Sequence, residues 1–157
     1  IRKIFPEIIR SAKRLAEKYD LQPVIACAGN IDEKIFSRSS NVQNFKIIKG
    51  HTYDLLKHSK FGIIKSGTST LEAGYFGLPA IDNIALANIV AGETIYDEMI
   101  QDDVNEENIF LKSDNVLGSE TVYNSIKNKL KIIREKLTEE GASKKAAEVI
   151  VSSLNES

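Results

Sequence analysis

The sequence predicts an α/β fold in which a parallel β-sheet carries helices on both of its faces. Short apolar runs that suit buried strands alternate with segments whose apolar residues recur every three or four positions. Parallel neighbours in a sheet need crossover connections, and the alternation supplies a helix for each of them. The length of 157 residues suits one domain with a sizeable core, so we expect residues 1–157 to form a single domain.

The composition is that of an ordinary globular protein, with 42% hydrophobic and 27% charged residues. The formal net charge is −1 and the basic residues form no block, so we expect no nucleic-acid partner. Cys27 is the only cysteine, which excludes an internal disulfide and, with no secretory signal, favours a cytoplasmic setting. No apolar run is long enough to span a bilayer. The first residue is not Met, so we expect the chain to be part of a longer protein.

The first half of the chain contains three predicted strands. An amphipathic helix is predicted to run to Tyr19, and residues 1–5 are expected in the turn that precedes it, because Pro6 is tolerated only near a helix start. The apolar runs predict strands at Gln22–Ala28, Phe45–Lys49 and Phe61–Ile64. Between them the sequence predicts a short helix over residues 31–37, a polar loop over Ser37–Asn44 and a helix that follows Gly50 and reaches Ser59.

The stretch from Phe61 to Pro79 is the best candidate for a binding site. Its strand ends before Ser66-Gly67, and Thr68 and Ser69 begin a helix that stops at Gly77. Free backbone N–H groups and the positive end of the helix dipole converge at such a turn, which makes it a natural anion site. We therefore predict that this turn holds the diphosphate of a nucleotide. The alternative is a capped helix start that binds no ligand.

Residues beside this turn extend the candidate site. Ligands of parallel sheets bind beyond the carboxyl ends of the strands, where Gly29-Asn30, Gly50-His51-Thr52 and the Ser66 turn all follow a strand. Glu72, one turn into the helix, either complements the helix dipole or accepts hydrogen bonds from a ribose diol. Three roles are open for the imidazole of His51: it caps the helix, it contacts a phosphate, or it faces water.

Other chemistries find little support. His51 and His58 are not surrounded by residues with the spacing of metal ligands, so we expect no metal site and no cofactor. His58 suits a solvated helix face. Cys27 lies in an apolar strand and suits the core. No GxSxG elbow is present, and Lys65 is either structural or a phosphate contact.

The pattern is less regular after Pro79. Ala80-Ile81 begins a strand, and an apolar run over residues 84–92 follows almost directly. Val104–Asn108 predicts a loop and a helix start, and residues 119–138 have helical spacing. A last helix is predicted beyond Gly141, and we expect these closing helices to pack on the sheet.

Four motifs together resemble the C-terminal half of the lipid-A-disaccharide synthase family. In chain order they are Gly50-His-Thr-Tyr-Asp-Leu-Leu56, Ser66-Gly-Thr-Ser-Thr-Leu-Glu-Ala-Gly-Tyr-Phe-Gly-Leu-Pro79, Leu86-Ala-Asn-Ile-Val-Ala-Gly-Glu93 and Gly141-Ala-Ser-Lys-Lys-Ala-Ala-Glu148. The resemblance covers nearly the whole chain. The second motif alone also resembles the peptidoglycan glucosaminyltransferase that makes lipid II.

The resemblance implies a Rossmann-like domain, the C-terminal, donor-binding half of a GT-B glycosyltransferase. Such an enzyme joins UDP-2,3-diacylglucosamine to 2,3-diacylglucosamine 1-phosphate (lipid X) in a β-1,6 linkage and releases UDP without a metal. It implies that Glu72 holds ribose and that the Gly50-His51-Thr52 turn flanks uracil and phosphates. It also implies that Asn88, Glu93 and Gln101 line the donor pocket. The setting implied is the cytoplasmic face of the bacterial inner membrane, where the enzyme acts as a peripheral protein. A homo-oligomer is compatible with that setting.

Two departures from the family pattern concern missing parts. The chain begins after the family's glycine-rich loop and after the N-terminal domain that carries the catalytic carboxylate, so we expect no general base here and an inactive fragment. The family also has an apolar, aromatic and basic segment before its Leu-Ala-Asn-Ile motif, where this chain has only Ala80–Ala85. We therefore expect a membrane-facing or oligomer-forming segment to be absent near residues 81–83.

Two other functions remain open at this point. One is a lipid II-type UDP-N-acetylglucosamine transferase, against which the Asn88–Glu93 run argues. The other is a non-catalytic binding module in which the Ser66 turn only caps a helix.

Overall fold

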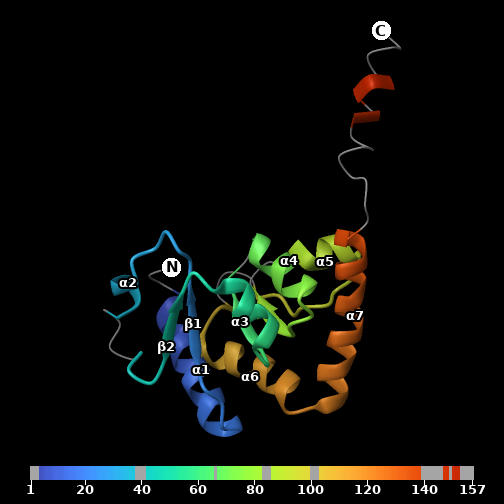
Figure 1. The fold of residues 1–157 in the computed structure, drawn as a ribbon. Coiled ribbons are helices and arrows are strands. Elements are labelled where there is room, and N and C mark those ends of the chain that lie inside the picture. Colours follow the sequence, from blue (N-terminus) through green and yellow to red (C-terminus); the bar gives the residue numbers. More distant parts are fainter. Residues whose placement is uncertain are drawn as a thin grey trace.

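The structure is a computed structural model that describes residues 4–37, 42–65, 67–82, 86–99, 103–138, 147–148 and 150–152. The strands and helices alternate through β4, after which three helices follow in succession (Figure 1). In chain order the elements are α1 (Phe5–Tyr19), β1 (Val24–Cys27), α2 (Lys34–Ser37), β2 (Lys46–Lys49), α3 (Thr52–His58), β3 (Gly62–Ile64), α4 (Thr68–Tyr75), β4 (Ala80–Asp82), α5 (Leu86–Ala91), α6 (Glu106–Leu117) and α7 (Glu120–Thr138). The α/β class is confirmed.

The strands pair in parallel, as predicted, but in two small sheets. β1 pairs with β2 in the register Val24↔Lys46, and β3 pairs with β4 in the register Gly62↔Ala80. An apolar groove of about 790 Å³ lies beside β1 and β3 and is lined by one face of α1. Thr52, Lys65 and Ser69 also line this groove, so the loops after β2 and β3 open onto the same space.

Three apolar clusters hold the elements together. The first joins α4, α5 and α7 through fully buried Leu130 and Ile133, with Tyr96 packed against them. The second packs Ile9 of α1 on Ile25 of β1, and the third packs Ile81 of β4 on Ile109 of α6. The candidate site therefore lies at the start of a helix, α4, that is itself packed into the core.

Helices α1 and α6 are joined by charge as well as by apolar contact. Arg10 bonds Glu7 and Glu106, and Arg14 bonds Glu107 at 2.7 Å. Glu7 also accepts the backbone N–H of Glu106 at 3.0 Å, so that its carboxylate caps the start of α6. The Arg10 side chain, and then the Glu106 N–H, hold the pKa of Glu7 below its ordinary value.

One packing prediction for the closing helices is wrong. The closing helices were expected to pack on the sheet, but helix α7 packs mainly on helices α4, α5 and α6. The described residues of the last segment are helical but exposed, with Ile150 at 60% and Val151 at 56%, and Figure 1 shows them projecting away from the domain.

Candidate functional site

The candidate site is built around the first turn of α4. Gly67 is the N-cap residue, with φ +102° and ψ −156°, a conformation that L side chains rarely adopt. Gly67 has no side chain that could cap this helix start, no other side chain among the described residues caps it, and Thr68 and Ser69 are exposed. The helix start therefore presents N–H groups, two hydroxyls and the positive end of the dipole to solvent. That is the arrangement an anion requires.

Thr70 holds this turn in place, although the sequence analysis assigned it no part in the site. Its side chain is fully buried, and its hydroxyl donates to the Gly67 carbonyl at 2.8 Å. The Thr70 N–H donates to the same carbonyl at 3.1 Å. The sequence did contain a signal for this role, a hydroxyl residue three positions after the turn glycine. At that spacing a hydroxyl can reach back across one helical turn to the glycine carbonyl.

Glu72 is half-buried, one turn further along α4. Among the residues that the structure describes, its carboxylate has no hydrogen-bond or ion-pair partner. This differs from the acidic side chains of α1 and α6, where Glu7, Glu106 and Glu107 all bond an arginine. The Glu72 carboxylate can therefore accept two hydrogen bonds from a ligand.

The turn after β2 is tied to β1. Gly50 has φ +79°, and its N–H donates to the Cys27 carbonyl at 2.9 Å. His51 Nδ1 lies 3.2 Å from the Asp54 carboxylate, and both side chains are exposed, at 68% and 74%. The contact with Asp54 uses Nδ1, so the Nε2 atom of this exposed imidazole is not engaged by it. Thr52 is half-buried in the wall of the groove that Ser69 also lines.

Asn88 and Glu93 are both engaged within the domain. The Asn88 carbonyl oxygen accepts the N–H groups of Ile95 and Tyr96 at 2.8 and 2.9 Å, and its amide donates to the Tyr96 carbonyl and the Glu98 carboxylate. Glu93 forms an ion pair with Lys129 at 2.8 Å. Asn88 thus organises the loop after α5. A contact with the donor stays a prediction for both residues.

Some predicted residues cannot be placed. Ser66 and Gln101 lie outside the described residues, as does Asn83, beside the expected missing segment. Cys27 is fully buried in β1, as predicted. In the described ranges no group of three or more His, Cys, Asp or Glu side chains could hold a metal ion, and no helix is both long and apolar enough to cross a membrane.

Comparison with known proteins identifies the family. A family profile described as "Lipid-A-disaccharide synthetase" matches residues 1–83. The lipid-A-disaccharide synthase of Persephonella marina is 30% identical over 176 aligned positions, covering 96% of this chain and 46% of that protein. The one from Syntrophus aciditrophicus is 27% identical over 180 positions, covering 100% of this chain and 47% of that protein. The one from Geobacter sulfurreducens is 27% identical and covers 98% and 46%.

No solved structure matches the chain significantly. The chain spans about half the length of the curated relatives it matches, 46% and 47% for the first two. The profile covers more than half of the chain, and the Persephonella relative is aligned along almost all of it. The chain belongs to the lipid-A-disaccharide synthase family.

Proposed function

We propose that this chain is the donor-binding part of a glycosyltransferase that joins UDP-2,3-diacylglucosamine to lipid X, forming lipid A disaccharide 1-phosphate and releasing UDP. The observation that carries the proposal is the N-terminus of α4, with the Glu72 carboxylate one turn away and without a partner among the described residues. The family assignment favours lipid A chemistry over the lipid II alternative.

The helix start supplies the chemistry that departure of UDP requires. When the acceptor hydroxyl attacks the anomeric carbon of the donor, the bond to the β-phosphate oxygen breaks and negative charge grows on the diphosphate. The uncapped N–H groups of α4 and the Thr68 and Ser69 hydroxyls stabilise that charge through oriented donors. The proton of the acceptor hydroxyl goes to a base that we place on the part of the enzyme preceding this chain.

The remaining contacts belong to the same proposal. Glu72 accepts from the ribose hydroxyls, and Gly50, His51 and Thr52 flank the uracil and the phosphates. Asn88 shapes the far wall of the donor pocket through the loop it holds, and Glu93 and Gln101 stand near that wall. Ser66 completes the phosphate turn.

The setting of the complete enzyme is part of the proposal. We place it at the cytoplasmic face of the inner membrane as a peripheral protein, because both sugar substrates carry acyl chains. A homo-oligomer fits the same setting. We expect the chain alone to turn over no substrate, because we place the general base and the other half of the cleft outside these residues.

The proposal includes a segment that the relatives have and this chain lacks. The alignments run over 176 and 180 positions, more than the 157 residues of this chain, and the family profile ends at residue 83. Both facts support a missing segment near residues 81–83, which stays a prediction.

Glu72→Ala provides the test of the ribose contact. We expect calorimetric titration to show UDP binding weakened about tenfold, the loss expected for hydrogen bonds to a charged group, with pyrophosphate affinity unchanged. Glu17→Ala is the matched control, because Glu17 is an exposed carboxylate on α1 whose nearest cation, Lys13, lies 4.0 Å away. Equal weakening of UDP and pyrophosphate by Glu72→Ala would remove its ribose role.

A further inference from the structure

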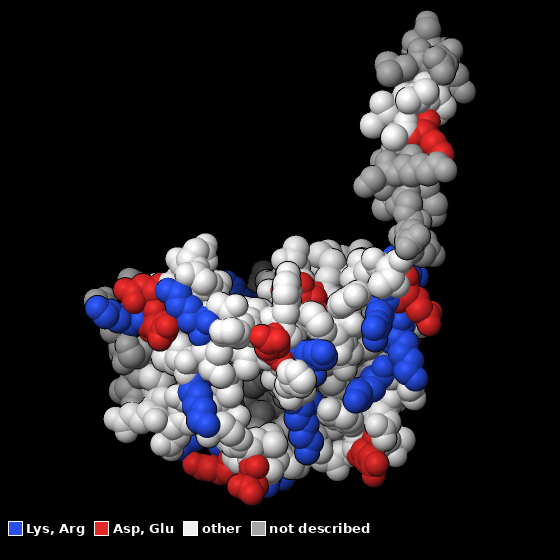
Figure 2. Space-filling model, in the orientation of Figure 1, with Lys and Arg blue, Asp and Glu red and all other residues white. Residues whose placement is uncertain are grey.

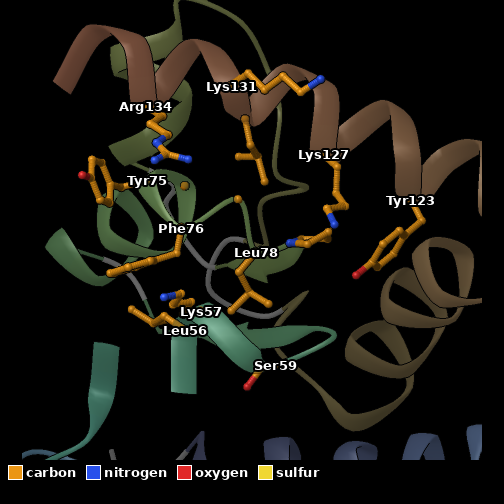
Figure 3. Close-up of a pocket in the computed structure, with 14 residues that line it drawn as sticks. Leu56, Lys57, Ser59, Tyr75, Phe76, Leu78, Tyr123, Lys127, Lys131 and Arg134 are labelled. Atoms are coloured by element: carbon orange, nitrogen blue, oxygen red, sulfur yellow. The ribbon is translucent and has the colours of Figure 1, made fainter. Parts of the chain in front are cut away.

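We propose that a second anion site, separate from the start of α4, binds a phosphate monoester. It is a pocket of about 230 Å³ between α7 and the C-terminal ends of α3 and α4, here called the α7 pocket. Its walls carry Lys57, Tyr75, Phe76, Tyr123, Lys127 and Arg134 (Figure 3). The volume suits a phosphate group with a few attached atoms and is too small for a whole nucleotide sugar.

The α7 pocket lies at the opposite end of α4 from the proposed diphosphate site. Its lining runs from Gly74 through Gly77 to Pro79, the residue before β4, whereas the diphosphate turn is at Gly67. An eight-residue helix is about 12 Å long, so one small anion cannot occupy both sites.

The pocket rests on a closely packed floor. A Cβ on Gly74 would lie 3.0 Å from Ile133 Cγ2, so α4 and α7 approach each other closely at this point. Leu130 is fully buried beneath the pocket, and the Leu78 carbonyl accepts the Tyr96 hydroxyl at 2.8 Å. On the rim, the Tyr123 hydroxyl donates to the Lys60 carbonyl at 2.7 Å. The walls are therefore held in place without a ligand.

The cations of α7 differ in what they contact. Lys129 pairs with Glu93 at 2.8 Å, and Lys136 donates to the Val90 carbonyl at 2.8 Å at the end of α5. Lys127 and Arg134 instead point into the α7 pocket in Figure 3, while the amine of Lys131 lies along the helix. Figure 2 shows Lys and Arg side chains gathered on this side of the molecule.

The pocket cations lack anionic partners. In the described part of the chain, no carboxylate or carbonyl bonds Lys57, Lys127 or Arg134. The nearest favourable contacts are aromatic and long, 5.8 Å from Arg134 Cζ to the Tyr75 ring and 5.9 Å from Lys127 Nζ to the Tyr123 ring. Like charges gathered over one pocket repel each other, and a bound anion removes that repulsion.

A purely structural role does not account for this arrangement. Cations near helix C-termini commonly neutralise the last carbonyls, as Lys136 does for α5. Lys127 and Arg134 make no such bond among the described residues, so their N–H donors remain available. A guanidinium and an ammonium group that line one pocket offer donors of the kind that a phosphate dianion accepts.

The test uses NMR of the ¹⁵N-labelled chain titrated with glycerol 3-phosphate, a soluble phosphate monoester. We expect saturable shifts at the amides of Tyr75, Phe76 and Gly77, weakened about tenfold in Lys127→Gln/Arg134→Gln and weakened further by added salt. Lys13→Gln, which removes one positive charge from the distant helix α1, is the control and should bind as the parent does. Absent shifts at these amides, or equal shifts in the double variant, would overturn the proposal.

Two further measurements make the result decisive. Lys57→Gln weakens binding from the α3 side, so the proposal stays testable if the double variant unfolds. Vesicles of phosphatidylcholine with phosphatidic acid test a membrane source of the same phosphate monoester, with pure phosphatidylcholine as control. Binding to either source that is lost in the variants supports the site. The amides of Thr68 and Ser69 report the diphosphate site in the same spectra, so the two proposals can fail separately.

Discussion

At the scale of single residues, Asn88 holds the loop after α5 in place. Its side chain accepts from two backbone N–H groups and donates to the Tyr96 carbonyl and the Glu98 carboxylate, so both atoms of its amide are used. We expect Asn88→Ala to lower the free energy of unfolding by about 2–3 kcal/mol, because the partly buried backbone groups lose their partners. Chemical denaturation measures this.

Asn88→Asp separates the acceptor from the donor role. The new carboxylate can still accept from Ile95 and Tyr96, but it faces Glu98 and has no N–H to give. We expect this variant also to be destabilised. A variant as stable as the parent would show that the amide donor contributes nothing.

Asp114 makes stability depend on pH. Lys18 Nζ at 2.6 Å, and then the Tyr19 hydroxyl at 2.7 Å, hold the pKa of this carboxyl below its ordinary value. A lowered folded-state pKa stabilises the protein above the unfolded value of about 3.9, and the gain is lost as pH falls through the folded value. Asp114→Asn should therefore have a lower melting temperature than the parent at pH 7. The difference should be only a few degrees, because the ion pair with Lys18 is partly exposed.

The pH profile checks the cause. The difference in melting temperature between Asp114→Asn and the parent should close between about pH 5 and pH 2. A difference that stays constant over this range would mean that the charge of Asp114 is not its source.

The roles of these residues were only partly predictable from sequence. The glycine and hydroxyls at Gly67–Ser69 predicted the start of α4 because capping is local. The bonds of Asn88 were not predictable, because its partners lie seven to ten residues away across a loop whose path depends on packing.

At the scale of elements, Gly74 sets the distance between α4 and α7. An added methyl group would lie 3.0 Å from Ile133 Cγ2, deep in the core. We expect Gly74→Ala to destabilise the domain by about 1–3 kcal/mol, since overpacking outweighs the gain in helix propensity. Thermal unfolding measures the effect.

Gly29→Ala is the matched control for this substitution. Its Cβ would meet no atom within 4 Å, and Gly29 is absent from the glycines with positive φ. It should leave stability nearly unchanged. If Gly74→Ala also left it unchanged, the close approach of α4 and α7 would not limit packing.

Periodicity predicted the long helices better than the short ones. α1 and α7, with 15 and 19 residues, show a clear apolar face in the sequence. α5 has six residues, Leu-Ala-Asn-Ile-Val-Ala, and so short an apolar run does not separate helix from strand. Tertiary packing of Ala87 against Tyr96 and Ile133 stabilises this run as a helix.

At the scale of the whole molecule, the parallel pairing was predictable but the division into two sheets was not. Alternating strands and helices imply parallel neighbours, whatever the number of sheets. The separation of β1 from β3 by an apolar groove depends on how α1 packs, which no local pattern encodes. The α7 pocket was not predictable from sequence either, because Lys57 and Arg134 are far apart in the chain and line the same pocket only after folding.

The central claim is that the start of α4 holds the diphosphate of a UDP-sugar. Titration of the ¹⁵N-labelled chain with UDP tests it most directly. We predict saturable binding with the largest shifts at the amides of Gly67, Thr68 and Ser69 and smaller ones at Gly50 and His51, together with a raised melting temperature. No saturable shift at the Gly67 turn and no change in melting temperature would contradict the account.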